Sequence, residues 1–188
     1  MMSARETDSD ELSGGIQGEQ DPFPVLLVED NEDDVWLLQK ALKKAGLALQ
    51  PIVVRDGAEA IDYLAGNGIY ADRGVFPFPY LILLDLNLPR RTGIEVLEWW
   101  ASEPRTLHPR IIVLTWSLLR SDIDRAYQLG VVSYLLKSGD NSQLAELIKR
   151  TLQFWSLSQR PATLEPAHAA SSPEARARLL RGLEIPPR

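Results

Sequence analysis

Short apolar runs alternate with amphipathic segments along most of the chain. Runs of this length are typical of strands that are buried on both faces of a sheet. The segments between them repeat apolar residues at helical spacing, and Gly46, Gly66 and Gly130 end three of them. The pattern predicts strands at Val25–Val28, Ile52–Val54, Tyr80–Leu84, Ile111–Leu114 and Val132–Leu136, and helices at Glu32–Ala45, Ala58–Leu64, Gly93–Ala101, Asp122–Leu129 and Asp140–Ser158.

Strands and helices alternate five times in this pattern. Such alternation predicts an α/β fold, a doubly wound five-stranded parallel sheet with helices on both faces. Asn31 is the expected cap of the first helix, and Glu32, Asp33 and Asp34 suit the positive end of its dipole. Residues 66–79, which are rich in Gly and Pro, are predicted to form a long loop.

The two ends of the chain differ in composition from its centre. Residues 1–22 carry six acids against one base and almost nothing apolar, which predicts a disordered acidic arm. Residues 160–188 form a tail rich in Ala, Ser and Pro, with a candidate short helix from Pro173 to Leu183. The folded domain is therefore expected to span residues 23–159.

Composition excludes several classes of function. The formal net charge of -6 and the pI of about 5.0 argue against binding to a nucleic-acid backbone. The absence of cysteine excludes disulfides, thiolate nucleophiles and Cys-based zinc sites. No apolar run reaches the roughly 20 residues of a membrane span, and the N-terminus lacks the pattern of a signal peptide. We therefore expect a cytoplasmic protein that does not contact a membrane.

Polar residues stand at the carboxyl ends of the predicted strands: Glu29, Asp30, Asp85, Thr115 and Lys137. An open parallel sheet binds its ligands outside these ends, so the five side chains are expected to converge. The three acids alone would repel one another. A hard divalent cation such as Mg²⁺ removes this conflict, because it prefers oxygen ligands.

Asp85 follows the apolar run Leu81–Leu84, where an unpaired carboxylate would be costly. Taken alone, Asp85 is most simply a turn or cap residue, and Glu29 and Asp30 could simply open the next helix. Taken together with the cation, Thr115 and Lys137, it becomes a candidate nucleophile that forms an aspartyl phosphate. The joint occurrence at several strand ends favours this second interpretation.

The stretch from Pro24 to Ser158 resembles a response-regulator receiver domain, the CheY-like fold with strand order 2-1-3-4-5. The matching pieces are VLLVEDN, LILLDLNLPRRTGIEVL, IIVLTWS and GVVSYLLKS. Thr115 lies 30 residues after Asp85, and Lys137 lies 22 residues after Thr115, which are the family's spacings. The resemblance covers most of the chain that is expected to be ordered.

The resemblance implies a role for each matching acid. Asp85 is the implied phosphorylation site. Asp30 and Asp85 are implied as direct Mg²⁺ ligands, with the backbone carbonyl of Asn87 as a third, and Glu29 is expected to act through a bound water. The implied activity is that of a phosphoryl acceptor with at most slow self-phosphorylation and self-dephosphorylation, and not that of an enzyme acting on other substrates.

The resemblance also implies how a signal leaves the site. Thr115 and Lys137 are expected to contact the phosphoryl group. Tyr134 occupies the family's switch position, where an aromatic residue moves together with Thr115 and repacks the face made by helix four, strand five and helix five.

Within the family, the chain is most similar to the small receivers that serve bacterial and cyanobacterial phytochromes. The motif DLNLPRRTG, the long loop after helix two, Ser138 after Lys137 and the Phe154-Trp155 ending carry this likeness. It implies a sensor histidine kinase as partner, a bacteriophytochrome in particular. Signalling would proceed without a DNA-binding output domain, because the residues after Arg160 are too few for one.

Two positions depart from the family pattern. Ser138 follows Lys137 where most receivers have proline in a cis bond, and a cis bond before a non-proline residue costs about 3 kcal/mol. Trp116 follows Thr115 where many receivers have a small residue. In the family a bulky residue there restricts access to the phosphoryl group, so slow dephosphorylation is expected.

The last predicted helix is longer than a minimal receiver needs. Most of its apolar residues are expected to face the core. Phe154, Trp155 and Leu157 are candidates for a symmetric homodimer interface that also includes helix four and strand five.

Other functions are weaker matches to the sequence. A phosphatase of the haloacid-dehalogenase type would place a second Asp two residues after the nucleophile, where this chain has Asn87. No phosphate-binding loop of the G-x-x-x-x-G-K-[ST] type occurs. A degenerate receiver used as a scaffold would not need the full set of acids, Thr115 and Lys137.

Overall fold

The computed structural model describes residues 24–47, 49–103, 108–138 and 142–156, with side chains as far as Arg150. In these residues the strands are β1 (Val25–Val28), β2 (Ile52–Val54), β3 (Leu81–Leu84), β4 (Arg110–Thr115) and β5 (Ser133–Leu136). The helices are α1 (Glu32–Lys44), α2 (Gly57–Ala65), the short 3-10 helix η1 (Gly68–Ala71), α3 (Gly93–Ser102), α4 (Arg120–Gln128) and α5 (Ser142–Ser156).

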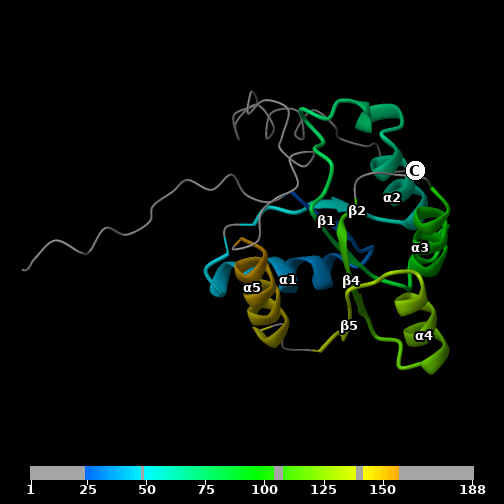
Figure 1. The fold of residues 1–188 in the computed structure, drawn as a ribbon. Coiled ribbons are helices and arrows are strands. Elements are labelled where there is room, and N and C mark those ends of the chain that lie inside the picture. The colour runs from blue at the N-terminus through cyan, green and yellow to red at the C-terminus, as the bar shows by residue number, and fades with distance from the viewer. Residues whose placement is uncertain (1–23, 48, 104–107, 139–141, 157–188) are drawn as a thin grey trace, which may run out of the picture.

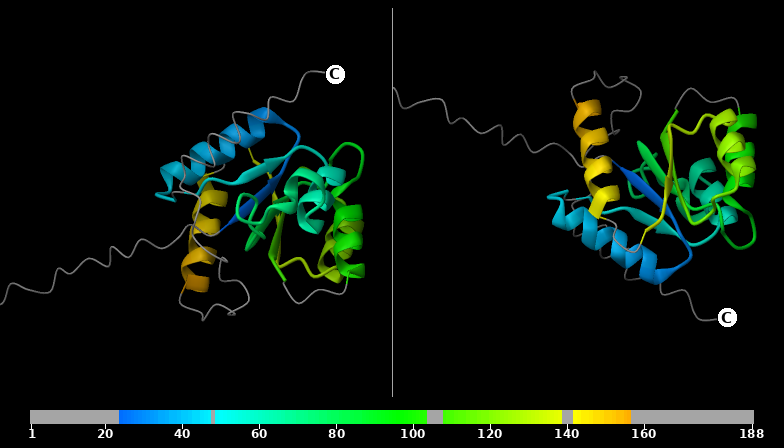
Figure 2. Two further views of the ribbon diagram at one scale, coloured as in Figure 1. Left: turned by 90° about the horizontal axis from the view of Figure 1, so that it is seen from above. Right: turned by 90° about the horizontal axis from the view of Figure 1, so that it is seen from below.

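The strands form one parallel sheet in the order β2-β1-β3-β4-β5, which confirms the predicted fold class. Helices α1 and α5 cover one face, and α2, α3 and α4 cover the other (Figures 1 and 2). Because side chains alternate along a strand, each strand contributes to both cores. In β1, Leu26 and Val28 pack on the side of α2 and α3, whereas Val25 and Leu27 pack on the side of α1 and α5.

Local sequence explains where the helices begin. The Asn31 side chain accepts hydrogen bonds from the backbone N–H groups of Asp33 and Asp34, as expected of a cap. Thr92 and Glu95 form a capping box at the start of α3. Helix α4 begins at Arg120, two residues earlier than expected. In its first turn, the Asp122 carboxylate accepts a hydrogen bond from the Ser117 hydroxyl at 2.6 Å, which links the helix to the preceding loop.

The segment 66–79 is more ordered than the predicted loop. Its 3-10 helix η1 places Tyr70 in the core, with ring centroids 5.1 Å from those of Tyr63 and Phe76. The Tyr63 hydroxyl donates a hydrogen bond to the backbone carbonyl of Pro77 at 2.7 Å. Aromatic packing thus orders residues 66–79, although their Gly and Pro content alone indicates a loop.

Several expectations concern residues outside the described part of the chain. The acidic arm 1–22, the tail 160–188 with its candidate helix, and Leu157 all lie there. Within the described residues no peptide bond is cis, so Lys137 and Ser138 are joined by a trans bond. None of the described helices is long and apolar enough to cross a membrane.

Candidate functional site

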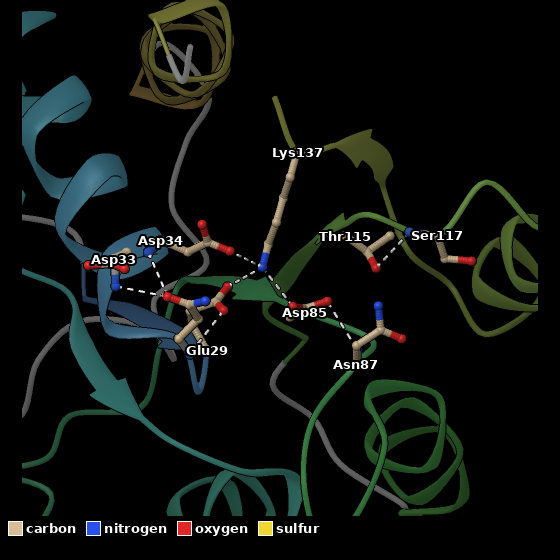
Figure 3. A network of polar contacts seen from close by, with 9 residues as sticks. Glu29, Asp33, Asp34, Asp85, Asn87, Thr115, Ser117 and Lys137 are labelled. Atoms are coloured by element: carbon tan, nitrogen blue, oxygen red, sulfur yellow. Dashed lines mark hydrogen bonds and ion pairs between the residues drawn. The ribbon is translucent and has the colours of Figure 1, made fainter. Parts of the chain in front are cut away.

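The predicted polar residues gather at one edge of the sheet, at the carboxyl ends of its strands (Figure 3). Glu29 and Asp30 follow β1, and Asp85 follows β3. Thr115 is the last residue of β4, and Lys137 directly follows β5. Register explains the convergence, because Val28 pairs with Leu84 and Thr115 pairs with Leu136, so the strands end almost level.

Lys137 is the centre of this group. Its Nζ lies 2.6 Å from Asp85 Oδ2, 2.6 Å from Glu29 Oε2 and 2.9 Å from Asp34 Oδ2. The Lys137, Glu29 and Asp85 side chains are 7%, 4% and 4% exposed. One buried ammonium therefore balances three carboxylates, which leaves the centre with excess negative charge.

The electrostatics of the centre reflect this imbalance. Burial raises the pKa of Glu29 above its ordinary value, although the hydrogen bond from Lys137 opposes the shift. Burial alone would lower the pKa of Lys137, but the hydrogen bonds to Asp85, Glu29 and Asp34 outweigh it and raise that pKa. The ammonium is thus held in its charged form.

Glu29, Asp30 and Asp85 each offer a carboxylate oxygen, and these oxygens lie within 4.8 Å of one another. Glu29 and Asp85 are buried, whereas Asp30 is exposed, so the group is closed on the protein side and open to solvent on the other. Such a donor set fits a hard divalent cation. The charge excess around Lys137 supplies a physical reason for a cation to bind there.

The loop after Asp85 is packed closely around it. Asp85 Oδ1 accepts a hydrogen bond from the backbone N–H of Asn87 at 3.0 Å, and the Asn87 side chain is exposed. Gly93 abuts the same peptide, because a Cβ there would lie 2.2 Å from the carbonyl oxygen of Asp85. The backbone at Asp85 is therefore fixed from two sides.

Thr115 and Tyr134 lie on the β4–β5 side of the site. Thr115 is fully buried, and its hydroxyl accepts a hydrogen bond from the backbone N–H of Ser117 at 3.3 Å. The half-buried Tyr134 donates from its hydroxyl to the Ser117 carbonyl at 3.0 Å. Burial raises the pKa of Tyr134. Thr115 and Tyr134 thus both bond to the backbone of Ser117. Trp116, which lies between Thr115 and Ser117 in the chain, is 55% exposed.

The predicted dimer residues are less completely described. Phe154 and Trp155 belong to the last turns of α5, but the structure does not describe their side chains, and Leu157 lies outside the described residues. Nearby elements do expose apolar residues: Leu118, Leu119 and Tyr127 on or before α4, Leu136 on β5 and Leu147 on α5.

Sequence reasoning missed two contacts. Asp34 was expected only to suit the helix dipole, yet it reaches Lys137, and no signal in the sequence marked this contact. Asp56 caps α2 through the Glu59 N–H at 2.8 Å and forms an ion pair with Arg90. The Asp-x-x-Glu spacing ahead of an apolar helix was the signal for that cap.

Comparisons with known proteins identify a family and similar chains. The family model for the response regulator receiver domain matches residues 25–149. Response regulator Rcp1 from Synechocystis sp. is 37% identical over 134 residues, which cover 71% of this chain and 89% of Rcp1.

Solved structures of response regulators are also similar to this chain. The phosphorylated cyanobacterial phytochrome response regulator RcpA has a TM-score of 0.63 and 39% identity, covering 73% of this chain and 96% of RcpA. The Mn²⁺-bound form of Rcp1 has a TM-score of 0.63, covering 75% of this chain and 100% of Rcp1. The bacteriophytochrome response regulator AtBRR has a TM-score of 0.60 and 38% identity, covering 75% of this chain and 100% of AtBRR.

Proposed function

Because this chain belongs to the response-regulator receiver family, we propose that it accepts a phosphoryl group on the Asp85 carboxylate. The donor is a phosphohistidine of a sensor histidine kinase. The observation that carries the proposal is a buried carboxylate held between the Lys137 ammonium, at 2.6 Å, and the acidic group of Glu29 and Asp30.

The transfer needs little covalent chemistry from the protein. An Asp85 carboxylate oxygen attacks phosphorus, the P–N bond to the kinase histidine breaks, and the imidazole leaves with the bonding electron pair. Lys137 and Thr115 are the groups that would hold the transferred oxygens. Asp30, Asp85 and the Asn87 carbonyl would hold Mg²⁺, with Glu29 acting through water. A bound Mg²⁺ would supply positive charge to the phosphoryl oxygens.

The signal would leave through the segment after β4. In this proposal Thr115 turns its hydroxyl toward the phosphoryl group. The hydrogen bond that this hydroxyl accepts from the Ser117 N–H is then broken. Tyr134 is bonded to the same residue through the Ser117 carbonyl, so a shift of the segment moves both. The altered face comprises α4, β5 and α5, and its exposed Leu119, Leu136 and Leu147 are available to a second copy in a homodimer.

The partner is proposed to be a phytochrome-type kinase in the cytoplasm. Support comes from RcpA and AtBRR, which are described as phytochrome and bacteriophytochrome response regulators. Slow dephosphorylation is part of the same proposal, because the bulky and exposed Trp116 directly follows Thr115 in the chain. A phosphatase activity is not favoured, because Asn87 cannot serve as the second acid of such an enzyme.

The test is the intact mass of the full chain after incubation with acetyl phosphate and Mg²⁺. We expect one added phosphoryl group in the wild type and none after Asp85→Asn or in EDTA. Asp56→Asn is the matched control, because it neutralises another buried carboxylate away from Lys137 and should still gain the group. An unchanged adduct in Asp85→Asn would overturn the proposal.

A further inference from the structure

The Lys137 ammonium has three N–H donors, and three carboxylates surround it. Two of these, Glu29 and Asp85, also belong to the group whose oxygens could hold a divalent cation. The third, Asp34, lies 2.9 Å from Nζ and is not a member of that group. The three partners of Lys137 are therefore not equivalent (Figure 3).

Asp34 is held firmly in the first turn of α1. Its backbone N–H donates to the Asn31 side chain at 3.3 Å, which fixes the start of the helix. Its side chain is 21% exposed, against 4% for Glu29 and Asp85. The carboxylate thus reaches Lys137 from the solvent side of the centre.

A cation at the acidic group changes the balance around Lys137. It would draw on the same carboxylates that hold the ammonium, Asp85 directly and Glu29 through water, and its charge would repel the ammonium. Asp34 is then the carboxylate that stays fully available to Lys137. Without it, the flexible lysine side chain could turn toward solvent at the moment when the phosphoryl group arrives.

We propose that Asp34 is a positioning residue that keeps the Lys137 ammonium beside Asp85 while the cation is bound. The inference rests on the proposed function, because it assigns Lys137 to the incoming phosphoryl oxygens. The hydrogen bond from Lys137 to Asp34 is one of those that raise the lysine pKa, in agreement with a tight pair.

The competing explanation is that Asp34 only suits the helix dipole. Asp33 is the natural control for it, because both acids stand in the first turn of α1 and both backbone N–H groups donate to Asn31. Asp33 is exposed, and in Figure 3 it lies on the side of Asp34 that faces away from Lys137. Asp33→Asn and Asp34→Asn therefore remove the same charge from the same helix turn.

The first measurement is the initial rate of phosphoryl gain from acetyl phosphate at saturating Mg²⁺, followed by intact mass. We expect Asp34→Asn to lower the rate roughly tenfold, as loss of a charged hydrogen bond implies. Asp33→Asn should stay within about twofold of the wild type, because an exposed charge has a weak effect. In a Lys137→Met background, Asp34→Asn should have no further effect.

The second measurement is nitrogen-detected NMR of the lysine ammonium groups in the Mg²⁺-loaded protein, which does not depend on phosphoryl transfer. Among the chain's five lysines, Lys137 is assigned as the signal lost in Lys137→Met. We expect this signal to persist with Mg²⁺ in the wild type and Asp33→Asn. In Asp34→Asn with Mg²⁺ it should broaden or vanish.

The outcomes separate the two proposals. A wild type that gains no phosphoryl group at Asp85 contradicts the proposed function. If the wild type reacts but Asp34→Asn matches Asp33→Asn in rate and in the ammonium signal, the positioning role is wrong. The role is also wrong if Asp34→Asn slows the Lys137→Met variant further, or weakens Mg²⁺ binding far more than Asp33→Asn does.

Discussion

Asp85 and Asp56 are two buried carboxylates that make the same kinds of direct contact. Each follows a strand of the sheet, and they are 4% and 6% exposed. Each accepts one backbone hydrogen bond, from Asn87 and Glu59 respectively. Each also pairs with one cationic side chain.

The difference lies in the neighbours of each pair. Asp56 pairs with Arg90, whose side chain is 64% exposed, and the nearby Glu59 carboxylate accepts hydrogen bonds from Tyr70 and the Arg55 backbone. Asp85 instead shares its ammonium with Glu29 and Asp34. The burial of one acid therefore does not mark a reactive site. The distinguishing feature of the Asp85 centre is its excess of converging carboxylates, which a divalent cation can balance.

The largest expected contrast comes from removing each cation. Lys137→Met leaves buried carboxylates without a partner and should cost about 3–5 kcal/mol in the free energy of unfolding in EDTA. Arg90→Met removes a mostly exposed partner and leaves Asp56 the hydrogen bond from the Glu59 N–H, so it should cost less than Lys137→Met. Urea unfolding of both variants checks this, and Mg²⁺ should restore stability to Lys137→Met more than to Arg90→Met. Equal losses of unfolding free energy in the two variants would contradict the difference proposed between the Asp85 and Asp56 pairs.

A smaller effect is expected from the cap at α2. Asp56→Ala removes the hydrogen bond to the Glu59 N–H and should lower the free energy of unfolding by about 1–2 kcal/mol. Asp56→Asn keeps a capping oxygen and should recover most of that loss. Both variants should gain a phosphoryl group at the wild-type rate. A block in either variant would mean that Asp56 belongs to the reactive centre.

The smallest effect is a pH trend at Glu29. Burial raises its pKa above the ordinary value, so its contribution to stability is complete below the unfolded pKa and is lost as pH rises through the folded pKa. In EDTA, Glu29→Gln should therefore gain stability relative to the wild type as pH rises above the unfolded pKa of about 4.3. Urea midpoints at increasing pH test it, and a constant difference would contradict the assigned direction.

Much of the fold could be predicted because the buried strands carry a clear signal. Continuous apolar runs such as Leu81–Leu84 identify strands whose faces are both covered, and the alternation with helices then fixes the parallel sheet. The segment 66–79 could not be predicted this way. Its order depends on the packing of Tyr70 against Tyr63 and Phe76. These three residues do not follow a helical or a strand repeat, so no sequence pattern announces their contact.

The site was predictable to the extent that it lies at strand ends. Glu29, Asp85 and Lys137 were expected to converge because the carboxyl ends of parallel strands share one edge. Asp34 lies on a helix, and its approach to Lys137 depends on where the start of α1 lies relative to the end of β5. Spacing alone does not fix that packing, so the number of carboxylates on Lys137 had to come from the structure.

The central claim is that Asp85, and not another buried acid, accepts the phosphoryl group. Borohydride reduces an acyl phosphate to the alcohol, so a phosphorylated Asp becomes homoserine at its position in the chain. Trypsin separates the candidates, because Asp85 is the sole acid of residues 74–90, whereas Asp56 lies in residues 56–73. After acetyl phosphate and Mg²⁺, we predict homoserine at position 85 alone, and none in EDTA. Homoserine at position 56, 29 or 30, with Asp85 unchanged, would contradict the account.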